Sequence, residues 1–108
     1  MKRCLAALVL VWAGQALAAP PSLTLWCAVA YMPARSTWVR EVQLQWDGDT
    51  LRDLRIDGLT PHSFSVQGDT IATAIDNERI EIDLRALTWR SDFRGQASGQ
   101  GRCERSDG

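Results

Sequence analysis

The chain has 108 residues, a formal net charge of −1 and 45% hydrophobic residues. This length fits one small domain and excludes a multidomain enzyme. Charged residues make up 23% of the sequence, which is ordinary for a folded protein and excludes a largely disordered chain. Basic and acidic residues number 12 and 13 and do not cluster, so no nucleic-acid partner is expected.

Residues 1–18 have the three-part order of a secretory signal peptide. A basic start, Lys2-Arg3, precedes an apolar run over 5–13 and the small-residue site Ala16-Leu17-Ala18. The run is too short to span a bilayer, which needs about 20 apolar residues. We therefore predict cleavage after Ala18, one domain over residues 19–108, a periplasmic or secreted location and no membrane span after cleavage. The alternative is a retained N-terminal anchor.

Two cysteines remain after the predicted cleavage, Cys27 and Cys103. An oxidising compartment favours a disulfide between them. A zinc site needs about four ligands, and only His62 could join the two thiols, so neither a metal nor a cofactor is expected. A bridge over so long a loop stabilises the domain by about 4 kcal/mol in the chain-entropy model.

Apolar residues alternate with period two along most of the domain, which predicts β-strands. The alternation indicates eight short strands, near residues 23–31, 38–46, 54–56, 64–66, 71–75, 80–84, 87–93 and 99–103. Turn signals separate them, including Asp47-Gly48 and Gly68-Asp69, because glycine accepts a positive φ. The predicted fold class is all-β, a small antiparallel meander of about eight strands that forms a closed barrel or a sandwich.

The two cysteines also predict how the sheet closes. Both lie on faces that carry apolar residues, so a bridge would place the first and last strands side by side. That arrangement favours a closed or nearly closed sheet, which removes exposed edges. Gly99 and Gly101 precede Cys103 on the same face and leave room for another backbone to approach closely.

Tryptophan is the unusual element of the predicted domain. Three of its four tryptophans fall on inward faces and are expected in the core: Trp38, Trp46 and Trp89. Arg40 interrupts the inward face on which Trp38 lies. Trp26 lies on the opposite face from Cys27, where it would be a binding anchor for a sugar or a protein if that face is exposed. The alternative is that this face is covered and Trp26 only packs.

His62 is the only histidine in the chain. Beside Thr60 and Ser63, with Asp57 as the orienting carboxylate, it could serve as a general base. A turn histidine next to Pro61 is the simpler interpretation, so no catalytic residue is assigned and the protein is not expected to be an enzyme. No phosphate-binding or dinucleotide-binding motif is present in the sequence.

The last strand carries a short motif, Gly99-Gln100-Gly101-Arg102-Cys103. Together with a signal peptide and a first strand bearing one cysteine, it resembles small exported bacterial β proteins with a single disulfide. The segment 80–85 is similar to a strand near the C-terminus of those proteins. The fragment Ser98-Gly99 is similar to a loop of periplasmic lysozyme inhibitors, which are small β-barrels with a single disulfide. Their following tyrosine and their lysine-bearing second loop are missing here, so no inhibitor residue is carried over.

These observations predict an exported, non-catalytic binding domain. Its partner would be a protein or an envelope ligand, and inhibition of a hydrolase is one form that such binding could take. A small periplasmic hydrolase and a structural envelope component are the alternatives. A deep pocket holding His62 and a carboxylate would favour the hydrolase, whereas an exposed patch around Trp26 would favour binding.

Overall fold

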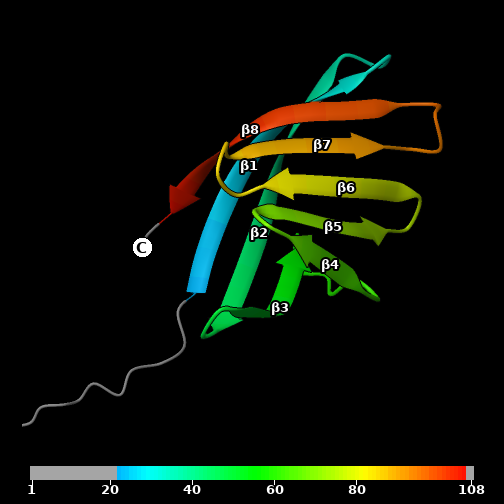
Figure 1. The fold of residues 1–108 in the computed structure, drawn as a ribbon. Helices are drawn as coiled ribbons and strands as arrows, with labels where there is room; N and C mark the ends of the chain where they lie inside the picture. Colours follow the sequence, from blue (N-terminus) through cyan, green and yellow to red (C-terminus); the bar gives the residue numbers. More distant parts are fainter. Residues whose placement is uncertain (1–21, 107–108) are drawn as a thin grey trace, which may run out of the picture.

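A computed structural model describes residues 22–106, so the predicted signal peptide lies outside the described residues. These residues form eight antiparallel strands of one sheet (Figure 1), which confirms the all-β prediction. The strands are β1 Ser22–Met32, β2 Ser36–Asp47, β3 Thr50–Ile56, β4 Phe64–Gln67, β5 Thr70–Ile75, β6 Glu78–Asp83, β7 Thr88–Asp92 and β8 Ser98–Ser106. Over residues 22–106 there is no helix of the length and hydropathy needed to cross a membrane.

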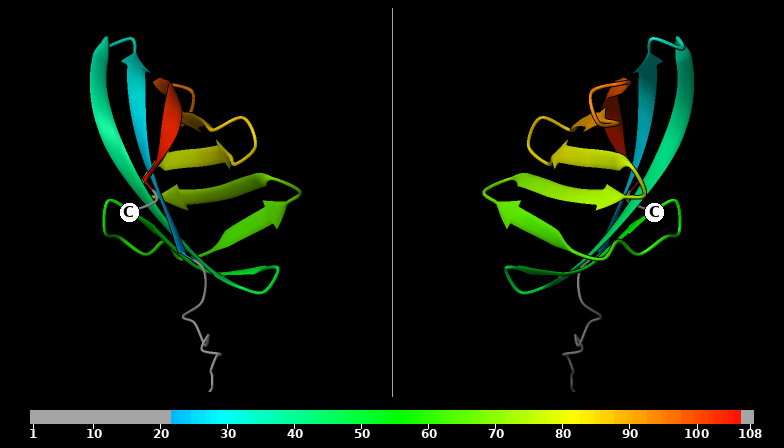
Figure 2. Two further views of the ribbon diagram at one scale, coloured as in Figure 1. Left: turned by 90° about the vertical axis from the view of Figure 1, so that its left-hand side faces the viewer. Right: turned by 90° about the vertical axis from the view of Figure 1, so that its right-hand side faces the viewer.

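The sheet closes through its terminal strands. The strand order is β3-β2-β1-β8-β7-β6-β5-β4, so β1 and β8 are hydrogen-bonded neighbours and β3 and β4 form the two edges. The sheet curls into a nearly closed barrel in which the wall of β1, β2 and β3 faces the wall of β4 to β8 (Figure 2). The choice between barrel and sandwich is thereby settled in favour of a barrel.

Tight turns occur where the sequence signals placed them. Gly48 in the turn between β2 and β3 and Gly68 in the turn between β4 and β5 both have φ of 62°. Asp76, between β5 and β6, also adopts a positive φ, 56°. The connection from β3 to β4 is longer, and its first residue, Asp57, has φ of 54°. This connection contributes to the site described below.

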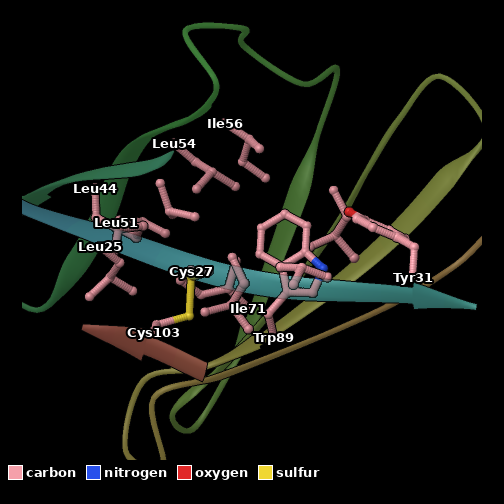
Figure 3. Packing of buried hydrophobic residues seen from close by; sticks show 14 residues of the cluster. Leu25, Cys27, Tyr31, Leu44, Leu51, Leu54, Ile56, Ile71, Trp89 and Cys103 are labelled. Atoms are coloured by element: carbon pink, nitrogen blue, oxygen red, sulfur yellow. A yellow bond between two sulfur atoms is a disulfide. The ribbon is translucent and has the colours of Figure 1, made fainter. Parts of the chain in front are cut away.

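The core lies between the two walls and is built from inward residues of every strand except β4 (Figure 3). Its fully buried side chains are Leu25, Cys27, Val29, Val42, Leu44, Leu54, Ile56, Ile71, Ile80, Ile82 and Trp89. Trp46 is partly buried and packs against this cluster. The prediction of a core position is therefore confirmed for Trp89, whereas Trp46 lies at the margin of the core.

The disulfide joins β1 to β8 as predicted. Cys27 and Cys103 are direct partners in the antiparallel register, and their Cα atoms lie 3.9 Å apart. A Cβ atom on Gly101 would lie 2.1 Å from the carbonyl oxygen of Ala28, so glycine permits the close approach of the two strands. A Cβ atom on Gly99 would lie 2.7 Å from the ring of Tyr31, so this position leaves room for the tyrosine.

The prediction that Trp38 is a core residue is wrong. Trp38 lies opposite Val29 in the register and shares its face of the sheet, as the alternation indicated. Its side chain is nevertheless 63% exposed, whereas Val29 is fully buried. The reason is the unequal length of neighbouring strands, since β3 ends before it reaches the level of Trp38.

Candidate functional site

One end of the barrel is open because β2 is longer than β3. The last paired residues of the two strands are Val42 and Ile56, so residues 36–41 of β2 extend beyond the end of β3. The other edge of this segment stays paired with β1. The end of the β1–β2 hairpin, which we call the arm, therefore rises above β3 with a free β2 edge, as Figure 2 shows, while β1 stays paired with β8 as far as Met32.

A hollow lies on the inner side of this arm, and we call it the barrel mouth. It has a volume of about 510 Å³, which is within the range of small-molecule sites in proteins. Its lining combines apolar and aromatic side chains with one ion pair, and includes Tyr31, Met32, Trp38, Phe93, Arg40 and Asp57. Mouths of β-barrels are a common place for ligand sites.

The walls of the mouth are apolar, and other parts of the protein leave them partly uncovered. Trp38 is 63% exposed and Met32 is 48% exposed. The rings of Tyr31 and Phe93 pack against each other with their centroids 5.9 Å apart at a tilt of 59°. This contact joins the arm to the end of β7, because Phe93 directly follows that strand.

The floor of the mouth is a hydrogen-bonded network centred on Arg40. Its Nη1 donates to Glu78 Oε1 and Oε2, at 3.0 Å and 3.2 Å, and to the hydroxyl of Tyr31. Its Nε donates to Asp57 Oδ2 at 2.6 Å. The Tyr31 hydroxyl donates to Glu78 Oε2 at 2.7 Å. The guanidinium carbon of Arg40 lies 4.8 Å from the ring centroid of Trp89, so the cation also rests on an aromatic face.

Asp57 is held in place by backbone contacts as well as by the guanidinium. Its Oδ1 accepts a hydrogen bond from the backbone N–H of Glu41 at 2.9 Å. Its own N–H donates to the carbonyl of Glu41 at 2.8 Å. The carboxylate is thus fixed at the edge of β2 just past the end of β3, and the floor is organised before any ligand arrives.

The sequence analysis missed the two residues at the centre of this floor. Arg40 was noticed only as an interruption of an inward face, and Glu78 was not singled out. Both occupy inward positions, since Arg40 is two residues before the buried Val42 and Glu78 is two residues before the buried Ile80. Opposite charges at inward positions of two strands indicate a buried ion pair, and this signal could have found them.

The network changes the acid–base properties of its members. Burial, followed by the hydrogen bond to Glu78 and the charge of Glu78, raises the pKa of Tyr31 to about 12, against the lowering effect of Arg40. Burial lowers the pKa of Arg40, but its hydrogen bonds to Asp57 and Glu78 raise that pKa above its ordinary value. Tyr31 is therefore a neutral hydroxyl and Arg40 a permanent cation.

A second hollow of about 680 Å³ lies along the outer faces of β4 to β7. His62 lines it together with carboxylates, and the small side chains of Ala72 and Ala74 lower its floor. Among the ion pairs of residues 22–106, none involves His62. Asp57 does not orient it, because both oxygens of that carboxylate bind Arg40 and Glu41. The groove therefore has a histidine without the paired carboxylate that a general base uses.

Trp26 lies on the outer face of β1 and is 44% exposed. The face is thus uncovered at this position, and the neighbours of Trp26 across the strands are Glu41 and Glu104. The structure does not bring Trp26 and Trp38 together, because they lie on opposite faces of the same hairpin. Binding through Trp26 stays a prediction.

Within the described part of the chain, no cluster of three or more His, Cys, Asp or Glu side chains is placed to hold a metal ion. Comparisons with protein-family models, with curated proteins and with solved structures find no match.

Proposed function

We propose that this protein is an exported, non-catalytic binding domain that receives its ligand at the barrel mouth. The observation that carries the proposal is the exposure of Trp38 on the inner side of the arm. A tryptophan buries about 150–250 Å² when covered, so contact with Trp38 contributes more binding free energy than contact with a smaller side chain. An exposed aromatic residue over a hollow is a typical anchor for binding.

The composition of the mouth supports binding of an amphipathic molecule. Ligand sites are mostly apolar and contain a few fixed polar groups that orient the ligand. Here the walls supply the apolar surface through Trp38, Met32 and Phe93, and the floor supplies the polar groups through Arg40 and Asp57. The floor is rigid because four separate parts of the chain meet in it.

Export is part of the proposal and has two supports. Residues 1–18 have the order of a signal peptide. The bond between Cys27 and Cys103 is of a kind that persists in the periplasm or outside the cell. A hydrolase remains the alternative class, since His62 lines a groove with carboxylates. A structural envelope component would need no ligand at the mouth.

The test uses a neutral apolar probe, so that it does not depend on charge. Nile red fluorescence should rise on addition of the oxidised protein, and Trp38→Ala should lower the affinity for the dye by about tenfold or more, as loss of a central aromatic anchor does. Trp26→Ala is the matched control, because it removes an exposed tryptophan from the opposite face of the same hairpin. Equal binding by the wild type and Trp38→Ala would contradict the proposal.

A further inference from the structure

We infer that the barrel mouth selects ligands that carry a positively charged ammonium or guanidinium group on an apolar body. This inference rests on the proposed function and specifies the chemical class of the ligand. Three observations carry it: the charge balance of the floor, the greater exposure of its carboxylate than of its guanidinium, and the aromatic walls.

The floor has more negative than positive charge. One guanidinium, that of Arg40, is paired with two carboxylates, those of Asp57 and Glu78, which gives a formal net charge of −1. Arg40 and Asp57 line the mouth, whereas Glu78 is 7% exposed and does not, so the excess negative charge comes from Glu78 next to the lining, and among residues 22–106 the lining holds no second cation. A cationic ligand would bring the formal charge of the site to zero.

The accessible charge at the mouth is the carboxylate rather than the guanidinium. The side chain of Asp57 is 38% exposed, whereas that of Arg40 is 16% exposed. Arg40 donates to its three partners through Nε and Nη1 and is the less exposed of the two charged groups, so a ligand anion that approached it would also face the Asp57 carboxylate. Each oxygen of Asp57 accepts one hydrogen bond and has a second lone pair, so an ammonium group can bind this carboxylate with the existing hydrogen bonds intact.

The aromatic walls favour the same ligand class. Cations bind to aromatic faces, most strongly to tryptophan, and Trp38 is the most exposed ring of the mouth. Phe93 and Tyr31 add two further rings to the lining.

The same chemistry is offered by a free organic amine and by a lysine side chain of a partner protein. A volume of about 510 Å³ admits either an alkyl amine or a lysine with part of its neighbouring residues. The experiment therefore includes both sources of the ammonium group.

The experiment measures displacement of Nile red from the oxidised protein by three probes of equal chain length: n-octylammonium, n-octanol and octanoate. We expect n-octylammonium to act at a concentration about tenfold lower than n-octanol, with octanoate weakest. Asp57→Asn should abolish the advantage of the ammonium over the alcohol, and asparagine tolerates the positive φ of this position. Asp49→Asn, in the turn at the other end of β2, removes an equal charge and should leave the order of the probes unchanged.

A short peptide with one lysine is compared with the same peptide carrying norleucine. Displacement by the lysine peptide supports the inference with a protein as the source, and displacement by n-octylammonium alone supports it with a free amine. Equal potency of the three octyl probes, or a stronger effect of octanoate, overturns the inference while the binding of Nile red still supports the proposed function. Failure of Nile red and all probes to bind would refute the proposed function itself.

Discussion

Removal of the guanidinium from the floor of the mouth should destabilise the whole barrel. In Arg40→Met the carboxylate of Glu78, which is 7% exposed, loses its cation. Loss of one partner of a buried ion pair costs about 3–5 kcal/mol. Arg40 itself is 16% exposed, so water reaches part of the network and we expect the lower end, about 3 kcal/mol. Methionine keeps apolar contact with Trp89, so the loss reports mainly on charge.

The assay is urea unfolding, monitored by tryptophan fluorescence at neutral pH. Arg52→Met is the control, because the pair of Arg52 and Asp47 is 63% and 67% exposed and should contribute at most about 1 kcal/mol. The double variant Arg40→Met, Glu78→Gln removes the stranded charge and should recover at least half of the lost stability. A loss no larger than that of Arg52→Met, or strictly additive effects in the double variant, would refute the coupling of these residues.

Three further predictions follow from the disulfide, the buried tyrosine and the histidine. Oxidised protein should show no reactive thiols when unfolded, and two thiols per chain would contradict the bridge. Cys27→Ser or Cys103→Ser should lower the free energy of unfolding by about 2–5 kcal/mol, and the double variant should be no less stable than either single one. Tyr31 is the only tyrosine, and its pKa is raised from 10.0 to about 12, so tyrosinate absorbance should rise near pH 12 in the folded protein. Its contribution to stability, about 2–3 kcal/mol, should be complete below pH 10 and lost as the pH rises toward 12, and a midpoint near 10 in the folded protein would contradict this. His62→Ala should change stability by no more than about 0.5 kcal/mol and leave Nile red binding intact, whereas loss of a hydrolytic turnover by several orders of magnitude would favour the enzyme alternative.

Much of the fold could be predicted because its determinants are local. Alternating residues such as Ile80 and Ile82 identify a strand and its inward face. Gly48 and Gly68 mark hairpin turns because each must adopt a positive φ. The disulfide followed from compartment and cysteine number, and it in turn indicated that the first and last strands are neighbours.

The site was harder to predict because it depends on relations between strands. Alternation placed Trp38 on the correct face but could not show that β3 ends at Ile56, opposite Val42, and leaves Trp38 uncovered. Sequence also could not show that Arg40 and Glu78, far apart in the chain, meet across the barrel. Inward charges on predicted strands were the available signal, and pairing them required the strand order.

The central claim is that the mouth, and not the outer face of β1, is where this protein binds its ligand. The most direct measurement follows the indole N–H resonances of the tryptophans by nuclear magnetic resonance during separate titrations with n-octylammonium and with the neutral probe Nile red. We predict that the resonance of Trp38 shifts in a saturable manner and that those of Trp26 and Trp46 stay in place. A saturable shift of Trp26 with Trp38 unmoved, or no shift of any indole, would contradict the claim.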